Sequence, residues 1–247
     1  MTEMMGKGPL ALAGLLVLSA ALGAGGVLAV QGLTAHTPDE AKIRGIVRDY
    51  VLENPEILPQ AMERLKSRET GKVVGGNRAA IFKPYAGAWE GNPNGDVTVS
   101  VWMDYACTYC RASLPMIAQL VAEDPRVRIV YRELPILSQV SRTAARWGLA
   151  AAEQGKFKPF HIALYSGPAL SDAAIAAAAA KAGLDQARAR ASIDAQRVDA
   201  EMASNLDLAG KLGMTGTPSW VIGDQVISGM VPYDALKAAV AAARSKK

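Results

Sequence analysis

The sequence contains only two cysteines, and they lie three positions apart in the tetrapeptide Cys107-Thr108-Tyr109-Cys110. The stretch before them, residues 96–103, is rich in β-branched and aromatic residues and predicts a buried strand. The stretch after them, residues 111–121, has the apolar spacing of a helix. The first sulfur therefore falls at a helix N-terminus, where unpaired N–H groups and the helix dipole stabilise a thiolate. This arrangement predicts thiol–disulfide exchange.

The composition argues against several other classes of function. Two cysteines cannot form a structural disulfide framework, and His36 and His161 are the only histidines available to complete a zinc site. We therefore predict no metal centre and no cofactor. A copper(I) site on the same two thiolates is the alternative, because soft ligands select that ion. The net charge of +4 is small and scattered, which gives nucleic-acid binding no support.

Residues 10–30 carry no charge and follow a short head that contains Glu3 and Lys7. A spanning helix needs about 20 residues, whereas the apolar core of a signal peptide has about 7–15. The length therefore favours an uncleaved signal-anchor, while the small residues of Val27-Leu28-Ala29 offer a cleavage site. Residues 1–31 are thus a signal peptide or a signal-anchor. Both alternatives predict export to an oxidising compartment.

Residues 38–70 predict an N-terminal helical arm that is interrupted at Asn54-Pro55, because proline disfavours helix at the preceding residue. Apolar residues recur at helical spacing on both sides of the break. They are Ile43, Ile46, Val47, Tyr50 and Val51, followed by Leu58, Ala61, Met62 and Leu65. Two interpretations fit this pattern equally: a solvated arm packed on its own domain, or an arm that forms a homo-oligomer through residues 40–68.

Residues 79–244 predict an α/β domain built around the cysteine pair. Residues 127–133 alternate as a second strand. With the helix between them, the two strands make a βαβ unit, so they should run parallel with a right-handed crossover. We also expect a hinge-like linker at residues 71–76 and a short strand at residues 79–82.

The second half of the chain predicts a helical insertion and the remainder of the sheet. Residues 138–212 are rich in alanine, the best helix former, and predict several helices. The expected breaks are near Gly155, Gly167-Pro168 and Gly183. Residues 219–222 and 225–228 flank Gly223-Asp224, a two-residue hairpin signal, and Pro232 opens a last helix.

Several ordered motifs together resemble a known family. Besides the Cys-X-X-Cys pair they are Tyr50–Glu56, Gly91–Thr98, Asp104-Tyr105, Arg132–Leu137 and Gly216-Thr217-Pro218. The chain resembles the DsbA-like thioredoxin-fold thiol:disulfide interchange proteins, and within them the suppressor-of-copper-sensitivity C branch of the Gram-negative periplasm. The resemblance covers about residues 40–243. It implies an α/β thioredoxin fold with a helical insertion, preceded by an N-terminal helical arm, and a periplasmic protein that residues 10–30 anchor to the inner membrane if they are retained.

The resemblance also assigns roles to individual residues. It makes Cys107 the exposed attacking sulfur and Cys110 the shielded resolving one. It makes Thr217-Pro218 a cis peptide bond that faces the disulfide and leaves the Thr217 backbone free to pair with an extended substrate strand. We expect Thr108, Tyr109, Thr217 and Pro218 to contact substrate. The expected partners are exported proteins with cysteines and a membrane redox partner.

Two departures from the family pattern affect the expected rate and direction of disulfide exchange. Relatives often bury a carboxylate six residues before the first cysteine, where this chain has Val101. Either another group takes over its role, with Glu133 as a candidate, or the proton transfer goes through water. The strongest oxidants of the family hold a histidine between the cysteines, where this chain has Thr108-Tyr109. We therefore expect a mild oxidant, with isomerase or reductase activity favoured.

Several other large side chains have simpler interpretations than a role in the site. Trp102, Met103 and Trp147 are expected in the core. Trp220 and Met230 either line an apolar rim beside Pro218 or belong to core and ordinary surface. His161 is expected as a helix-surface or capped histidine, since no partner cluster surrounds it in sequence.

Overall fold

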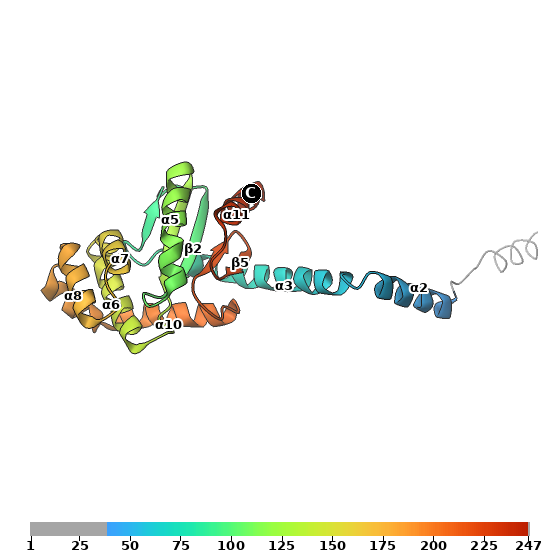
Figure 1. Cartoon of the computed structure of the whole chain (residues 1–247), viewed down its shortest axis with the longest axis horizontal. Coiled ribbons are helices and arrows are strands. Elements are labelled where there is room, and N and C mark those ends of the chain that lie inside the picture. The colour runs from blue at the N-terminus through green and yellow to red at the C-terminus, as the bar shows by residue number, and fades with distance from the viewer. Residues whose placement is uncertain (1–38, 247) are drawn as a thin grey trace, which may run out of the picture. The chain divides into compact units, whose positions relative to one another are not determined.

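The structure is a computed structural model that describes residues 39–246 (Figure 1). The predicted signal peptide or signal-anchor at residues 1–31 lies outside the described residues. None of the helices within residues 39–246 combines the length and the apolar character that crossing a membrane requires. The chain divides into two compact units between Met62 and Glu63, so the boundary falls inside one helix and not in a separate linker.

The N-terminal unit contains α2 (Glu40–Glu53) and the start of α3 (Ile57–Gly76). The Asp39 side chain caps α2 by accepting a hydrogen bond of 3.1 Å from the backbone N–H of Ala41. The break between the two helices at Asn54-Pro55 is confirmed. α2 has no buried residue, and its apolar stripe stays exposed.

Two local expectations are wrong. Residues 71–76 are the last turns of α3 and not a linker, because fully buried Val74 packs into the core there. Residues 79–82 belong to the short helix α4 (Arg78–Phe82) and not to a strand. In α4 a helical turn buries Ile81 against the same core cluster as Val74. In both places tertiary packing overrides a weak local preference.

The second unit is built on one five-stranded sheet of order β1-β3-β2-β4-β5. The strands are β1 (Trp89–Gly91), β2 (Val97–Met103), β3 (Val127–Glu133), β4 (Ser219–Ile222) and β5 (Gln225–Ser228). β2 and β3 are parallel, with Met103 opposite Glu133, as the βαβ pattern predicts. The expected hairpin is confirmed, since β4 and β5 pair antiparallel around Gly223-Asp224.

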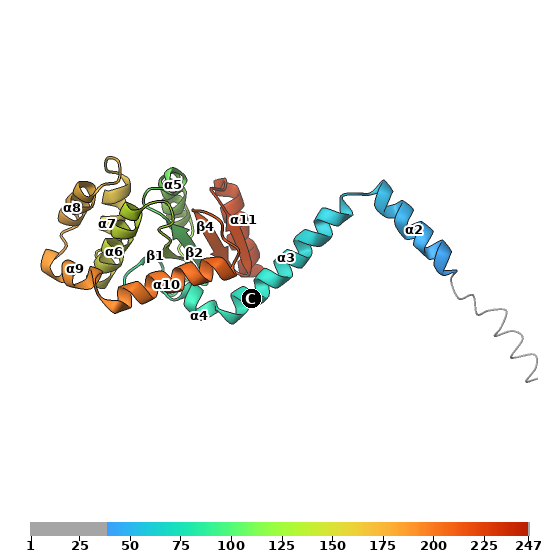
Figure 2. The same cartoon turned by 90° about the horizontal axis from the view of Figure 1, so that it is seen from below.

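Successive residues of β2 face opposite sides of the sheet, and each side has its own helices. Val99 and Val101 pack in one core cluster with α5 (Thr108–Glu123) and α11 (Tyr233–Ser245). Trp102 packs in a second cluster with α4 and α10 (Gln196–Lys211). Figure 2 shows α5 and α10 on opposite sides of the sheet. The expected core positions of Trp102, Met103 and Trp147 are confirmed, and Trp220 is also fully buried.

The insertion between β3 and β4 consists of helices joined by short non-helical segments, as expected. Its helices are α6 (Gln139–Glu153), α7 (Phe157–Tyr165), α8 (Asp172–Lys181), α9 (Gln186–Ile193) and α10. The chain leaves helix near each of the three predicted breaks. α6 and α7 pack against the same core cluster as the cysteines, so the insertion forms one wall of the site.

A buried ion pair ties the insertion to β3. Arg132 and Glu201 lie 2.7 Å apart, with side chains 3% and 15% exposed, and Arg132 also donates to the carbonyls of Ala80 and Lys83. We expect Glu201→Ala to lower the free energy of unfolding by about 3 kcal/mol, because it leaves a buried guanidinium without its counter-charge.

Urea denaturation measures this loss. The matched control is Asp207→Ala on the same helix, which removes an exposed pair with Lys211 and should cost less than about 1 kcal/mol. Equal losses in the two variants would contradict the assignment of the Arg132–Glu201 pair as a structural tie.

Candidate active site

Cys107 is the N-cap residue of α5 and Cys110 lies in its first turn. The backbone N–H of Cys110 donates to Cys107 Sγ over 3.3 Å, so the first sulfur accepts a hydrogen bond as a capping oxygen would. Both sulfurs are free thiols. Cys110 is fully buried, whereas Cys107 keeps 7% exposure. Cys107 is the more exposed of the two sulfurs, as expected. It is nevertheless less exposed than the resemblance implied, because the loop that contains Thr217 covers it.

The Thr217-Pro218 peptide bond is cis, the geometry that the resemblance implied. The Cys107 thiol donates to the Thr217 carbonyl over 3.2 Å. The two segments are 110 positions apart in sequence and meet because β4 pairs with β2. Ionisation of Cys107 removes its donor to Thr217 but keeps the Cys110 N–H bond. When Cys107 is a thiolate, the Thr217 carbonyl therefore no longer accepts a hydrogen bond from it.

Asp104 fixes the loops on either side of the cysteine pair. It is buried, and its two carboxylate oxygens accept three backbone hydrogen bonds of 2.8–2.9 Å, from the N–H groups of Ala106, Ile136 and Leu137. One side chain thus holds the entry to α5 and the loop after β3 in one arrangement. The backbone of Ile136 and Leu137, whose apolar side chains are exposed, is held in place as a result.

A chain of buried polar groups lies behind the cysteines. The Tyr105 hydroxyl donates to Glu133 Oε1 over 3.0 Å and lies 3.1 Å from His161 Nδ1. Because the Tyr105 hydroxyl donates its hydrogen bond to Glu133, it accepts one from Nδ1 of neutral His161, and His161 Nε2 has no hydrogen-bond partner among residues 39–246. Gly148 of α6 makes room for the chain, since a Cβ there would lie 2.7 Å from Glu133 Oε1 and 2.8 Å from the Tyr105 hydroxyl.

The expectation of a surface or capped histidine is wrong. His161 is buried among aromatic rings, and its ring stacks on Phe157 with the centroids 5.0 Å apart. Burial lowers the pKa of His161 to about 3, so the imidazole is neutral at physiological pH. Burying a neutral imidazole costs far less free energy than burying an ion, so His161 is compatible with the apolar face of α7.

Burial also controls the protonation of the acidic groups. It raises the pKa of Cys110, so the resolving sulfur is a thiol in this dithiol form. It raises the pKa of Glu133 well above its usual range, against a smaller lowering by the Tyr105 hydrogen bond. Burial likewise raises the pKa of Tyr165.

Tyr165 packs beside this cluster. Its ring centroid lies 4.9 Å from that of Tyr105, and its hydroxyl donates to the Asp104 carbonyl over 2.9 Å. Sequence reasoning missed Tyr165. Its only signal is the four-residue spacing from His161, which places the two on one face of α7.

The other sequence-predicted site residues lie in two places. Thr108 and Tyr109 are exposed at the start of α5, and Tyr109 is 63% exposed. Val101, where relatives bury a carboxylate, is part of the apolar cluster around Cys110. Within the described part of the chain, no three histidine, cysteine, aspartate or glutamate side chains are grouped as a metal site would need.

Comparison with known proteins identifies the family and the fold. The model of the DSBA-like thioredoxin domain matches residues 98–241, which is more than half of the chain. The chain belongs to this family. The model of the copper resistance protein ScsC N-terminal domain matches residues 39–70, which contain α2 and most of α3. Cys107 and Cys110 lie within the residues that the DSBA-like model matches.

Several solved structures are similar over most of their length. A thioredoxin-like oxidoreductase from Silicibacter pomeroyi is 42% identical, with a TM-score of 0.66 over 68% of this chain and 98% of that one. A periplasmic thioredoxin-like protein from Salmonella enterica serovar Typhimurium is 30% identical, with a TM-score of 0.62 over 68% and 95%. A linker-deletion mutant of Proteus mirabilis ScsC is 25% identical, with a TM-score of 0.68 over 87% and 99%. The fold is therefore that of a thioredoxin-like protein with a helical insertion and an N-terminal helical region.

Two curated relatives are much longer proteins. The Na(+)/H(+) antiporter NhaA 3 of Salinispora tropica is 31% identical over 150 residues, which is 60% of this chain and 23% of the antiporter. An NhaA 1 antiporter of Salinispora arenicola matches over the same lengths at 29% identity. The chain thus spans about a quarter of the length of the curated relatives it matches.

Proposed function

We propose that this chain is a periplasmic thiol:disulfide oxidoreductase that acts on exported proteins through Cys107 and Cys110. The observation that carries the proposal is the position of Cys107 Sγ. It lies at the N-cap of α5, accepts the Cys110 N–H and faces the Thr217 carbonyl, with a shielded second thiol one turn behind. This is the geometry of an attacking thiolate beside an edge where an extended peptide can pair.

The reduced pair reacts in two steps. The Cys107 thiolate attacks a substrate disulfide, so one S–S bond breaks, a mixed disulfide forms and one substrate thiolate leaves. Cys110 then loses its proton and attacks Cys107 Sγ, which releases the second substrate thiolate and leaves Cys107–Cys110 oxidised. In isomerisation a thiol of the substrate performs the second attack, and the pair remains reduced. The oxidised pair runs the same steps backwards and leaves a new disulfide in the substrate.

The preferred direction depends on the residues between the cysteines. Thr108 and Tyr109 bring no positive charge to the thiolate, and we infer a mild oxidant that favours isomerisation or reduction. Equilibration with glutathione buffers measures the reduction potential of the pair, where about 30 mV corresponds to 1.4 kcal/mol. A potential as high as about −120 mV, the range of the strongest oxidants, would overturn the inferred direction.

The buried Glu133 is the proposed acceptor for the Cys110 proton. The resolving thiol is fully buried, so its proton needs an internal acceptor. The Asp104 carboxyl already accepts three backbone N–H groups, whereas the Glu133 carboxyl accepts from the Tyr105 hydroxyl, so Glu133 is the proposed acceptor. We infer that the transfer from Cys110 is indirect, so Glu133 acts from behind the reacting atoms.

We expect Glu133→Gln to slow the second step while leaving the first unchanged. The reagent 5,5′-dithiobis(2-nitrobenzoate) separates the steps, because attack by Cys107 releases one coloured thiolate and resolution by Cys110 releases another. The second release should slow about 10²-fold, the usual contribution of a positioned base. In the wild type this release should accelerate as rising pH ionises Glu133, whose pKa lies above its usual range, and the variant should lose that part of the profile.

A surface pair of the same chemistry provides the control. Tyr233 donates to Glu123 over 2.7 Å at the far end of α5, and Glu123→Gln should change neither release. An unchanged rate and pH profile of the second release in Glu133→Gln would exclude Glu133 as the proton acceptor.

The exposed stripe of the arm supports a homo-oligomer. Ile46, Val47 and Tyr50 are 56–60% exposed on α2, and Met62 of α3 is 71% exposed. An apolar stripe of this length is costly to leave in water, and helices with such stripes associate through them. We propose that residues 40–68 join copies of this chain, so that several cysteine pairs surround one misfolded substrate. A membrane redox partner would then return the pair to its working state.

Copper(I) binding is the second candidate, favoured by the match of residues 39–70 to the copper resistance protein ScsC N-terminal domain. The ligands would be the thiolates of Cys107 and Cys110, which suit a soft ion. Copper(I) competition with a chromogenic chelator tests it. Stoichiometric binding without insulin reduction would replace the exchange proposal, whereas insulin reduction without binding would remove the copper candidate.

A further inference from the structure

A cavity of about 500 Å³ lies at the end of the sheet away from the cysteines. It is formed by α4, the start of β2, the β4–β5 turn and the end of α11. Val97 opens β2 in this cavity, and Met103 ends the strand on the cysteine side. At about 3.3 Å per residue, some 20 Å of strand separates the cavity from the site of exchange. Its volume falls in the range of pockets that hold small molecules, about 300–1,000 Å³.

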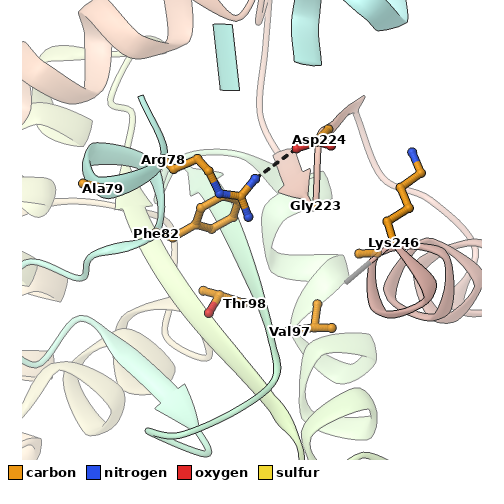
Figure 3. A pocket seen from close by; sticks show the side chains of 9 residues that line it. Arg78, Ala79, Phe82, Val97, Thr98, Gly223, Asp224 and Lys246 are labelled. Carbon is orange, nitrogen blue, oxygen red and sulfur yellow. Dashed lines mark hydrogen bonds and ion pairs between the residues drawn. The ribbon is translucent and has the colours of Figure 1, made fainter. Parts of the chain in front are cut away.

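One wall of the cavity is a cation stacked on an aromatic ring. The Arg78 guanidinium lies 5.3 Å from the centre of the Phe82 ring, and Arg78 Nη1 is 3.0 Å from Asp224 Oδ1 (Figure 3). Arg78 makes no other side-chain hydrogen bond within residues 39–246, so the remaining donors of its guanidinium are available. Phe82 and Val97 add apolar surface beside these donors.

The opposite side of the cavity carries a second cation. Lys246 follows α11, and its ammonium forms no ion pair with any residue the structure describes. Thr98 lies next to Val97 at the start of β2, on the Phe82 side of the cavity (Figure 3), and accepts a hydrogen bond of 3.0 Å from Arg128, which leaves its own hydroxyl proton free to donate. Two cations and a hydroxyl donor therefore face the single carboxylate of Asp224, and the cavity has an excess of positive charge.

The walls are held in place before any ligand arrives. Gly223 has a φ of +60°, and a Cβ there would lie 2.9 Å from the Cβ of Ala243, so the β4–β5 turn packs tightly on α11. We propose that this cavity binds a small organic anion with a flat apolar body, of the class of aromatic carboxylates. The acid group meets Lys246, Thr98 and the free donors of Arg78, and the flat body lies against the apolar surface that Val97 provides beside the Arg78–Phe82 stack. The site is separate from the cysteines and does not depend on disulfide exchange.

The probe is 2-naphthoate, whose own fluorescence anisotropy reports binding to the full chain. We expect saturable binding that weakens about tenfold in Lys246→Glu, which reverses one charge, and at least as much in Ala79→Phe, which fills the cavity and leaves its charges. Lys211→Glu, at an exposed lysine of α10, should bind as the wild type does. The uncharged 2-naphthamide should bind about tenfold more weakly than the acid. Insulin reduction should be unchanged in both cavity variants, which shows that they are folded.

Three results would overturn the proposal. They are the absence of saturable binding, binding that neither Lys246→Glu nor Ala79→Phe weakens, and equal affinity for the acid and the amide. None of them bears on the exchange reaction, which the cysteine variants test independently.

Discussion

Cys107→Ser is expected to abolish insulin reduction and the oxidation of dithiol peptides, with a loss on the order of 10³-fold or more. A serine hydroxyl at the N-cap still accepts the Cys110 N–H, so α5 should remain capped and the fold intact. The loss would therefore report the missing nucleophile and not unfolding. Circular dichroism and the urea midpoint verify that the variant is folded.

Cys110→Ser separates the two steps of the same reaction. Cys107 can still attack, but nothing resolves the intermediate, so mixed disulfides with substrates should accumulate and be visible as reducible adducts by mass spectrometry. Adducts on Cys110 in the Cys107→Ser variant would reverse the assigned roles. Undiminished insulin reduction in Cys107→Ser would remove the proposed function altogether.

Charging the stripe of the arm is expected to convert an oligomer to a monomer. The double variant Ile46→Glu and Val47→Glu places two carboxylates where exposed apolar side chains stand. Recovery of activity from scrambled ribonuclease should fall roughly 10²-fold, since linked active sites raise the effective concentration around one substrate by factors of that size. Insulin reduction, which needs only one cysteine pair, should be retained.

Light scattering and the ribonuclease assay measure the two effects together. Arg48→Glu, a charge change at the neighbouring position of α2, is the matched control and should leave the mass unchanged. A wild-type chain that is already monomeric would refute the oligomer, and an oligomeric double variant would show that α2 is not its contact.

Much of the fold could be predicted because its signals are local. The parallel pairing of β2 with β3 follows from a strand–helix–strand pattern, and the β4–β5 hairpin follows from two residues, Gly223-Asp224. The errors occurred where local preference is weak. Residues 71–76 and 79–82 are helical because Val74 and Ile81 fill a core cluster with Trp102, a contact that no short window of sequence contains.

The candidate site could likewise be predicted only in part. By itself the sequence determined that a dithiol stands at the start of a helix after a buried strand, since spacing and periodicity along fewer than thirty residues are enough for that. Only the tertiary structure decided what surrounds the dithiol. The Tyr105 hydroxyl meets Glu133 and His161 across 28 and 56 positions of sequence, and Cys107 meets Thr217 across 110. Which polar groups share a buried space depends on how the sheet and the insertion pack, and burial in turn shifts the pKa values of Glu133 and Cys110.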